Sequence, residues 1–107
     1  MSSTRLDDPI LVRFRQALGE VYGSKLERVV LFGSRARGDA RPDSDYDVAV
    51  FLKDMKEFGR EVRVVAAIGS DILRDEGAVI NAMPLPEGSY RDRTGFMGEI
   101  RRDGRDL

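Results

Sequence analysis

The stretch LFGSRARGDARPDSDYDVAV, residues 31–50, decides the fold of this chain. It continues a valine-rich apolar run, residues 28–32, that predicts a buried strand. Gly33 and Ser34 break this run sharply and predict a turn into the start of a helix. A glycine lets the backbone approach a ligand closely, the Ser34 hydroxyl can donate to a phosphate oxygen, and free N–H groups at a helix start favour an anion. The corner therefore predicts a phosphate site.

Two acids stand where the next strand begins. Residues 46–52 predict a strand, and Asp45 and Asp47 lie two positions apart, so both side chains point to the same side, roughly 6–7 Å apart at the backbone. Two carboxylates this close are unfavourable unless a cation lies between them. Oxygen ligands with no His or Cys nearby suit a hard ion, which predicts Mg²⁺, with Mn²⁺ as the alternative.

Simpler interpretations exist for some of these polar residues. Asp43 and Ser44 are typical of a turn with a capping side chain. For Asp47 this interpretation is weaker, because an unpaired carboxylate inside an apolar strand is costly. Arg35, Arg37 and Arg41 can clamp phosphates through forked hydrogen bonds, although arginines on a solvated helix and loop are common without any ligand.

Together these residues resemble the signature of the minimal nucleotidyltransferases, in the polymerase-beta-like nucleotidyltransferase superfamily. The signature reads G-S-x-A-R-G-x-A-x-x-x-S-D-x-D and covers residues 33–47 here. The resemblance implies that Asp45 and Asp47 are catalytic and hold the metal. It also implies a set of residues that bind the nucleotide, ATP or another nucleoside triphosphate: Gly33, Ser34, Arg35, Arg37 and Ser44.

The order of predicted elements extends this resemblance over nearly the whole chain. A helix from Asp8 and Pro9 to Tyr22 precedes the Gly-Ser strand, and a helix over 56–74, a strand over 78–85 and a last helix follow the D-x-D strand. The resemblance implies an α/β (α+β) fold with a small mixed sheet, the polymerase-beta-like nucleotidyltransferase fold. With 107 residues and 41% apolar content, residues 1–107 are expected to form a single nucleotidyltransferase domain.

Two apolar helical stripes are expected to form core. Gly69 and Ser70 are expected to end or bend the second helix. The first stripe comprises Ile10, Leu11, Phe14, Leu18, Val21 and Tyr22. The second comprises Phe58, Val62, Val65, Ala66, Ile72 and Leu73.

The third strand carries the main departure from the family pattern. In the resembled family this strand presents a third carboxylate to the metals, and the matching position here holds Asn81, which is expected to contact the metal through its amide oxygen. One interpretation is that Asp71, Asp75 or Glu76 supplies the third acid. In a second, two acids and the substrate phosphates suffice for slow transfer. In a third, the domain is degenerate and acts by binding a nucleotide or a partner.

The resemblance also implies a reaction and a partner. The chain is expected to transfer a nucleoside monophosphate, AMP from ATP, to an acceptor hydroxyl on a helical HEPN-type protein, as the antitoxin of a toxin–antitoxin pair. Apolar groups in residues 84–90 and at Phe96, Met97 and Ile100 are candidates for core or for a partner surface, including one for a second copy of the chain. An aminoglycoside-type transferase is disfavoured, since no acceptor domain is present.

Composition narrows the remaining classes. The chain has 18 basic and 19 acidic residues, so its overall field does not draw it onto nucleic acid as a main partner. It has no cysteine, which removes disulfides and thiolate chemistry. No apolar stretch marks export or membrane insertion, and a cytoplasmic location without membrane contact is expected.

Overall fold

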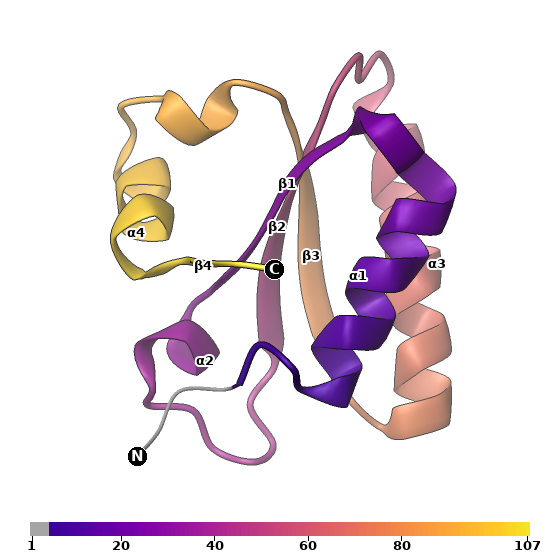
Figure 1. The fold of residues 1–107 in the computed structure, drawn as a ribbon, viewed down its shortest axis with the longest axis vertical. Helices are drawn as coiled ribbons and strands as arrows, with labels where there is room; N and C mark the ends of the chain where they lie inside the picture. Colours follow the sequence, from indigo (N-terminus) through magenta and orange to yellow (C-terminus); the bar gives the residue numbers. More distant parts are fainter. Residues whose placement is uncertain (1–4) are drawn as a thin grey trace.

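The chain folds into one mixed sheet with helices on both faces, in a computed structural model that describes residues 5–107 (Figure 1). Two short 3₁₀ turns, Gly23–Lys25 and Ser89–Arg91, lie between the larger elements. These elements are, in chain order, α1 (Pro9–Tyr22), β1 (Leu26–Phe32), α2 (Ser34–Arg37), β2 (Tyr46–Leu52), α3 (Phe58–Glu76), β3 (Ile80–Pro86), α4 (Gly95–Asp103) and β4 (Arg105–Asp106).

The strands follow the order β3-β2-β1-β4. Strand β1 runs antiparallel to β2 and to β4, whereas β2 and β3 are parallel because α3 connects them as a crossover. The predicted α/β class and small mixed sheet are therefore confirmed. The short strand β4 was missed by the sequence prediction, because a strand of two residues is too short to show an alternating hydrophobic pattern.

Helix α1 forms where the sequence predicts it. The Asp8 side chain accepts a hydrogen bond of 2.8 Å from the Ile10 backbone N–H, and Pro9 takes the first helical position, where its missing N–H costs nothing. The helix ends before Gly23, which has a φ of 54°. Leu11, Phe14 and Leu18 of its stripe are buried, but Val21 is 55% exposed, so the expectation that Val21 belongs to the core is wrong.

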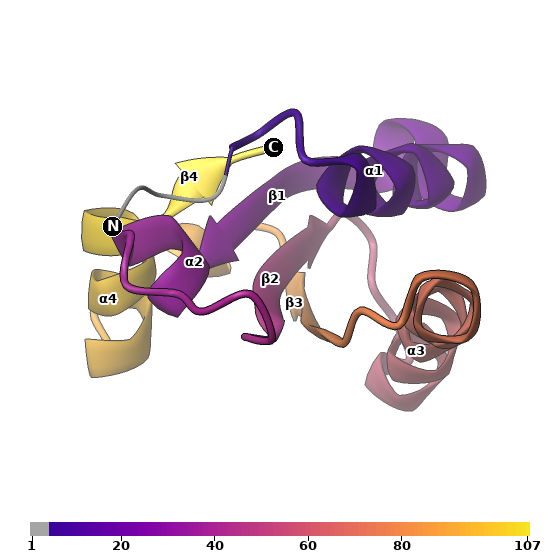
Figure 2. The ribbon, with the colours of Figure 1, turned by 90° about the horizontal axis from the view of Figure 1, so that it is seen from below.

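The sheet has a core on each face. Figure 2 shows α1 and α3 on one side of the strands and α4 on the other. Alternate residues of β2 serve the two sides, since side chains alternate along a strand. Val48, Val50 and Leu52 pack with α1 and α3, and Ala49 and Phe51 pack with Met97 and Ile100 of α4.

Helix α3 is continuous through Gly69 and Ser70, so the expectation that the helix ends there is wrong. Only Val65 and Ile72 of its predicted core stripe are fully buried. The remaining members are exposed. Their exposure corrects the prediction: Phe58, Val62, Ala66 and Leu73.

Strand β3 contains two prolines, and it extends one residue beyond the predicted end at residue 85. Pro84 and Pro86 pair in register with Val50 and Leu52 of β2. The N–H of Glu87 donates to Leu52, and the ladder alternates, so Pro84 and Pro86 lie at positions whose backbone nitrogen faces away from β2. Proline is tolerated there because no hydrogen bond to β2 is lost.

The part of the chain that the structure describes contains no helix of the length and apolar character needed to span a bilayer.

Candidate active site

Asp47 and Asn81 lie in one row across the sheet, together with Phe32. Phe32 of β1 pairs with Asp47 of β2, and Asp47 pairs with Asn81 of β3. Paired residues of neighbouring strands point to the same face, so this row brings together residues that are far apart in the sequence. It lies on the sheet face that α4 partly covers, where the Phe96 ring of α4 meets the Phe32 ring edge to face with centroids 5.6 Å apart.

Asn81 connects the two carboxylates. Its side-chain Nδ2 donates to Asp45 Oδ2 at 2.9 Å and to Asp47 Oδ1 at 3.5 Å. Asp45 and Asn81 are exposed, and Asp47 is half-buried. The structure therefore brings Asp45, Asp47 and Asn81 together, as the sequence predicted, but Asn81 faces the acids with its donor nitrogen, whereas the prediction assumed its oxygen faced a metal.

Gly33 lies directly against Asp47. Its φ of 73° and ψ of −157° are a backbone conformation that is essentially reserved for glycine. A Cβ added at Gly33 would lie only 2.3 Å from Asp47 Oδ2. The glycine is therefore required for the close approach of the turn to the acid, and Ser34, the first residue of α2, starts beside the carboxylate pair.

Burial raises the pKa of the Asp47 carboxyl above its ordinary value. The hydrogen bond from Asn81 acts in the opposite direction, because it stabilises the ionised form. The negative charges of Asp45 and Glu99 raise this pKa further, and the Arg37 guanidinium lowers it. Asp47 thus lies in a field made by four neighbours from the D-x-D turn, α2, β3 and α4.

Arg35 contacts the loop between α2 and β2. Its side chain is buried, and its guanidinium donates to the backbone carbonyls of Ser44, at 2.7 and 2.9 Å, and Pro42, at 3.2 Å. The same group lies 3.8 Å from the centre of the Tyr46 ring. These contacts fix the loop that leads into Asp45, and phosphate binding by Arg35 stays a prediction.

Ser44 is a turn residue in this structure. Its Oγ accepts a hydrogen bond of 2.8 Å from the Arg41 backbone N–H, and its own N–H donates to the Arg41 carbonyl at 3.0 Å. This closed turn agrees with the simpler of the two interpretations given above. It orients the chain so that Asp45 enters the site from the turn and Asp47 from the strand.

Arg37 is exposed and remains close to the acids. Its Nε lies 3.4 Å from Asp39 and its Nη1 lies 3.6 Å from Glu99 Oε1. Glu99 was missed by the sequence analysis, because nothing in the pattern of the last helix marks it. The only available signal was its place on the polar face of a helix whose opposite face carries the buried residues Met97 and Ile100.

The expectation that α3 supplies a third acid is wrong. Asp75 pairs with Arg13 at 2.7 Å, and Glu76 also faces Arg13, at 3.8 Å. Asp71 pairs with Arg74 at 3.2 Å. Within residues 5–107, no three or more His, Cys, Asp or Glu side chains group in a way that could hold a metal ion.

The donor set nevertheless suits one hard cation. Two converging carboxylates and an amide provide oxygen atoms only, with no sulfur or imidazole, and Mg²⁺ commonly takes one or two protein carboxylates and fills its other positions with water and substrate phosphates. The hydrogen bonds that Asn81 donates to both acids show that the pair accepts a group of positive partial charge between its carboxylates. The residues therefore fit the metal expected from the sequence.

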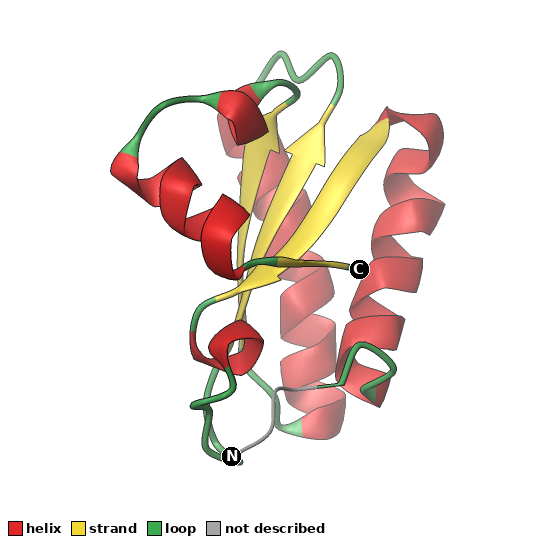
Figure 3. Ribbon diagram, turned by 60° about the vertical axis from the view of Figure 1, so that its left-hand side comes forward, coloured by secondary structure: helices red, strands yellow, loops and turns green. Residues whose placement is uncertain are grey.

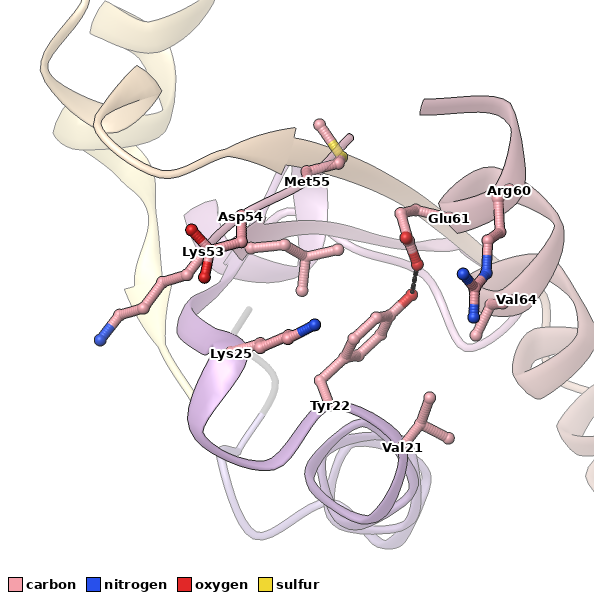
Figure 4. Close-up of a pocket in the computed structure, with 10 residues that line it drawn as sticks. Val21, Tyr22, Lys25, Lys53, Asp54, Met55, Arg60, Glu61 and Val64 are labelled. Atoms are coloured by element: carbon pink, nitrogen blue, oxygen red, sulfur yellow. Dashed lines mark hydrogen bonds between the residues drawn. The ribbon is translucent and has the colours of Figure 1, made fainter. Parts of the chain in front are cut away.

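A separate cavity lies at the other end of the sheet, where β2 ends. It has a volume of about 150 Å³ and lies between the end of α1 and the start of α3. Figure 4 shows the Tyr22 hydroxyl donating to Glu61 at 2.9 Å in its wall, with Lys25 and Arg60 around it. None of the predicted site residues lines this cavity, so it is distinct from the carboxylate pair.

Comparison with known families matches residues 20–89 to the family described as polymerase beta, nucleotidyltransferase. This match includes the Gly-Ser corner, both aspartates and Asn81. The chain belongs to the polymerase beta nucleotidyltransferase family. The family and the enzyme class expected from the sequence are thereby confirmed.

Two relatives come from Methanocaldococcus jannaschii, and both carry names that propose protein adenylyltransferase activity. One is 36% identical over 56 residues, which are 52% of this chain and 57% of the relative, so the match spans little more than half of that protein. The other is 27% identical over 103 residues, which are 94% of this chain and 97% of the relative.

Solved structures share the nucleotidyltransferase fold. A nucleotidyltransferase so named from Sulfolobus solfataricus is 25% identical, with a TM-score of 0.58 over 91% of this chain and 80% of its own. A toxin–antitoxin MntA-HpeT structure and a toxin–antitoxin structure with AMP-PNP each have a TM-score of 0.63 over 89% of this chain and 69% of theirs. At 16% and 17% identity, these last two show the fold alone.

Figure 3 places the short helix α2 at the end of the sheet where β1 finishes and β2 begins, which is the end that carries the signature of this nucleotidyltransferase family.

Proposed function

We propose that residues 1–107 act as one nucleotidyltransferase domain that moves AMP from ATP to a hydroxyl group of a partner protein, with Mg²⁺ bound. The observation that carries this proposal is the convergence of Asp45 and Asp47 beside the Gly33 corner in a chain of this family. Relatives named as protein adenylyltransferases support AMP as the transferred group and protein as the acceptor.

Each residue has a chemical role in this proposal. Asp45 and Asp47 would hold the cation, with Asn81 as a neutral neighbour. The Ser34 hydroxyl at the start of α2 would bind outer phosphate oxygens, with Arg37 beside it. When bound, the cation would neutralise the triphosphate and so lower the charge barrier to attack. Arg35 and Ser44 would keep the loop in place.

The reaction is a direct displacement. The acceptor hydroxyl oxygen attacks the α-phosphorus and releases its proton to solvent, a new phosphate ester forms, the bond from the α-phosphorus to the oxygen bridging to the β-phosphate breaks, and pyrophosphate leaves. Transfers of this kind depend mainly on positioning and charge stabilisation, so a site with few protein acids remains competent for slow turnover. The chain has no cysteine or histidine that could form a covalent intermediate, and direct transfer agrees with this composition.

The acceptor in this proposal belongs to a toxin–antitoxin partner. The toxin–antitoxin neighbours, one of them with AMP-PNP, support a nucleotide and a protein partner for this fold. We propose a helical HEPN-type toxin that this chain neutralises as the antitoxin, by binding it, by transferring AMP to it, or both. Because ATP is the donor, the proposal includes a cytoplasmic location.

One observation favours a second function. Asn81 brings no negative charge to the strand position where the resembled family has an acid, so cation binding is weaker than with three carboxylates. The alternative is a domain that binds a nucleotide or a partner and transfers little or nothing. The two functions differ in turnover, and the binding of ATP is common to both.

Label transfer from ATP that carries its label on the α-phosphate tests the proposal. The chain is incubated with Mg²⁺ or Mn²⁺ and with proteins of the source cell, beside Asp45→Asn and Asp47→Asn. Asp43→Asn is the matched control, because Asp43 is an exposed acid of the same loop outside the converging pair. We expect a labelled protein with the unaltered chain and with Asp43→Asn, and none with the other two variants.

Each other result has a defined meaning. If ATP binds in equilibrium dialysis but no label moves, the binding function replaces the transferase. If neither binding nor transfer occurs, or if transfer survives in Asp45→Asn or in Asp47→Asn, the site assignment is wrong.

A further inference from the structure

The carboxylate pair is compensated without any ion. Asp45 and Asp47 carry like charges that would push their side chains apart. The Nδ2 group of Asn81 lies between them, with its two hydrogen atoms available for one acid each, at 2.9 and 3.5 Å. The amide therefore supplies, through partial positive charge, the compensation that a cation gives elsewhere.

The orientation of this amide follows from the charges. A carboxylate only accepts hydrogen bonds, so two ionised acids attract the NH₂ group of asparagine and repel its carbonyl oxygen. A cation between the same acids has the opposite preference, because it attracts the oxygen and repels the NH₂ group. The two ends of one side chain thus suit two different states of the site.

We propose that Asn81 is a positioning residue that holds Asp45 and Asp47 together in the metal-free protein, and that its side-chain amide flips when a divalent cation enters. Oδ1 then replaces Nδ2 on the side that faces the acids. This inference rests on the proposed function only in that the same site takes the cation, and it requires no nucleotide and no transfer.

The choice of residue at this position has a consequence for stability. Asparagine keeps the empty site intact, whereas an aspartate at position 81 would add a third like charge to Asp45 and Asp47. The same aspartate would bind a cation more strongly, because it adds charge and breaks no hydrogen bond on binding. Compared with aspartate, asparagine at position 81 therefore lowers the cation affinity but keeps the site formed before the cation arrives.

The sequence makes the flip of this amide testable by NMR spectroscopy. Asn81 is the only asparagine and Gln16 the only glutamine, so the side-chain NH₂ groups of a ¹⁵N-labelled sample give two pairs of signals. Gln16 is exposed on α1, which lies on the other face of the sheet and provides an internal control. We expect Mg²⁺ to move the Asn81 pair and leave the Gln16 pair in place.

The reading of this titration is unambiguous. If the backbone signals of Asp45 and Asp47 move with Mg²⁺ and the Asn81 pair does not, the proposed flip of the Asn81 amide is wrong. If none of these signals moves, the inference fails together with the metal-dependent part of the proposed function. If the Asn81 pair moves but no label transfer occurs, the inference holds and only the proposed transferase fails.

Asn81→Asp gives a second, independent measurement. We expect its melting temperature in a chelator to fall below that of the unaltered chain, and Mg²⁺ to raise it by a larger step, with a cation affinity at least about tenfold higher. Gln16→Glu makes the same amide-to-acid change on an exposed helix and should show neither effect. Equal melting temperatures of Asn81→Asp and the unaltered chain in the chelator would overturn the inference.

Discussion

Gly33 and Asp47 approach each other so closely that any side chain at position 33 would displace the Asp47 carboxylate. A Cβ there would lie 2.3 Å from Asp47 Oδ2 and 3.2 Å from Asp47 Cγ. The turn after β1 and the acid on β2 therefore depend on each other, although 13 positions in the sequence separate them. This contact, between the first and the last residue of the 33–47 signature, joins the predicted phosphate corner to the predicted metal ligands.

Gly33→Ala should displace the Asp47 carboxylate. We expect a loss of about 3 kcal/mol in the free energy of unfolding, from backbone strain and the clash together, and a loss of nucleotide transfer of about tenfold or more. Gly77→Ala is the control, because Gly77 also has a positive φ, 72°, but has nothing within 4 Å of an added Cβ. It should lose about 1 kcal/mol and keep its activity. Urea denaturation and label transfer measure both quantities; equal activity losses would contradict the prediction.

Substitutions of Arg35 and Arg37 should have different effects, the first on stability and the second on ATP binding. Arg35→Gln removes the donors to the Ser44 and Pro42 carbonyls, and we expect it to cost about 1–3 kcal/mol of unfolding free energy. Arg37→Gln should leave the melting temperature nearly unchanged, because that side chain is exposed, and should weaken ATP binding. Thermal melting and equilibrium dialysis give the two readouts. The reverse pattern would assign the phosphate role to Arg35.

Glu99→Gln should release Arg37 toward the nucleotide. The pair is 3.6 Å apart with both side chains about 40% exposed, so its strength is below about 1 kcal/mol. We expect ATP affinity to rise about two- to fivefold, measured by calorimetry. The same substitution made on Arg37→Gln should have no effect, since the partner is gone. An equal rise in both backgrounds would mean that Glu99 acts on the nucleotide without Arg37.

The stability of the fold should fall in strong alkali through Tyr46. Burial and the hydrogen bond to Asp8 raise the pKa of Tyr46 from 10.0 to about 12. Because the folded-state pKa is the higher one, the neutral hydroxyl stabilises the fold fully below pH 10, and this contribution is lost as pH rises toward 12. Tyr22, bonded to Glu61, has a raised pKa for the same reasons.

Ultraviolet titration of tyrosinate, followed beside chemical denaturation at each pH, measures this effect. Tyr46→Phe should show a flatter fall in stability between pH 10 and 12 than the unaltered chain. An unchanged slope would show that the hydroxyl of Tyr46 ionises in the folded state as easily as in the unfolded state.

Local chemistry made part of this structure predictable. Asp8, Pro9 and Gly23 mark the ends of α1 through capping and backbone preferences that need no distant partner. The alternation of Asp45 and Asp47 likewise placed both acids on one side. The signature between residues 33 and 47 is long enough to identify the family from sequence alone.

What the sequence did not reveal depends on contacts between distant segments. The inward turn of Arg35 requires the carbonyls of the 42–44 loop, and the donor orientation of Asn81 requires both acids to be in place. Glu99 reaches Arg37 only because α4 packs over the end of β1. Phe58 and Leu73 follow the helical period, but no other element within residues 5–107 covers them and both are exposed. The period of a helix does not indicate how much of its apolar face the rest of the fold will cover.

The prolines of β3 restrict how this molecule can meet others. An open sheet edge is a template for fibril growth, because its backbone groups can pair with any extended chain. Pro84 and Pro86 remove two outward N–H groups from that edge, so a fifth strand cannot be added along its second half. A protein with this edge is protected against runaway self-association, and whatever binds along this half of the edge has to recognise side chains rather than extend the sheet.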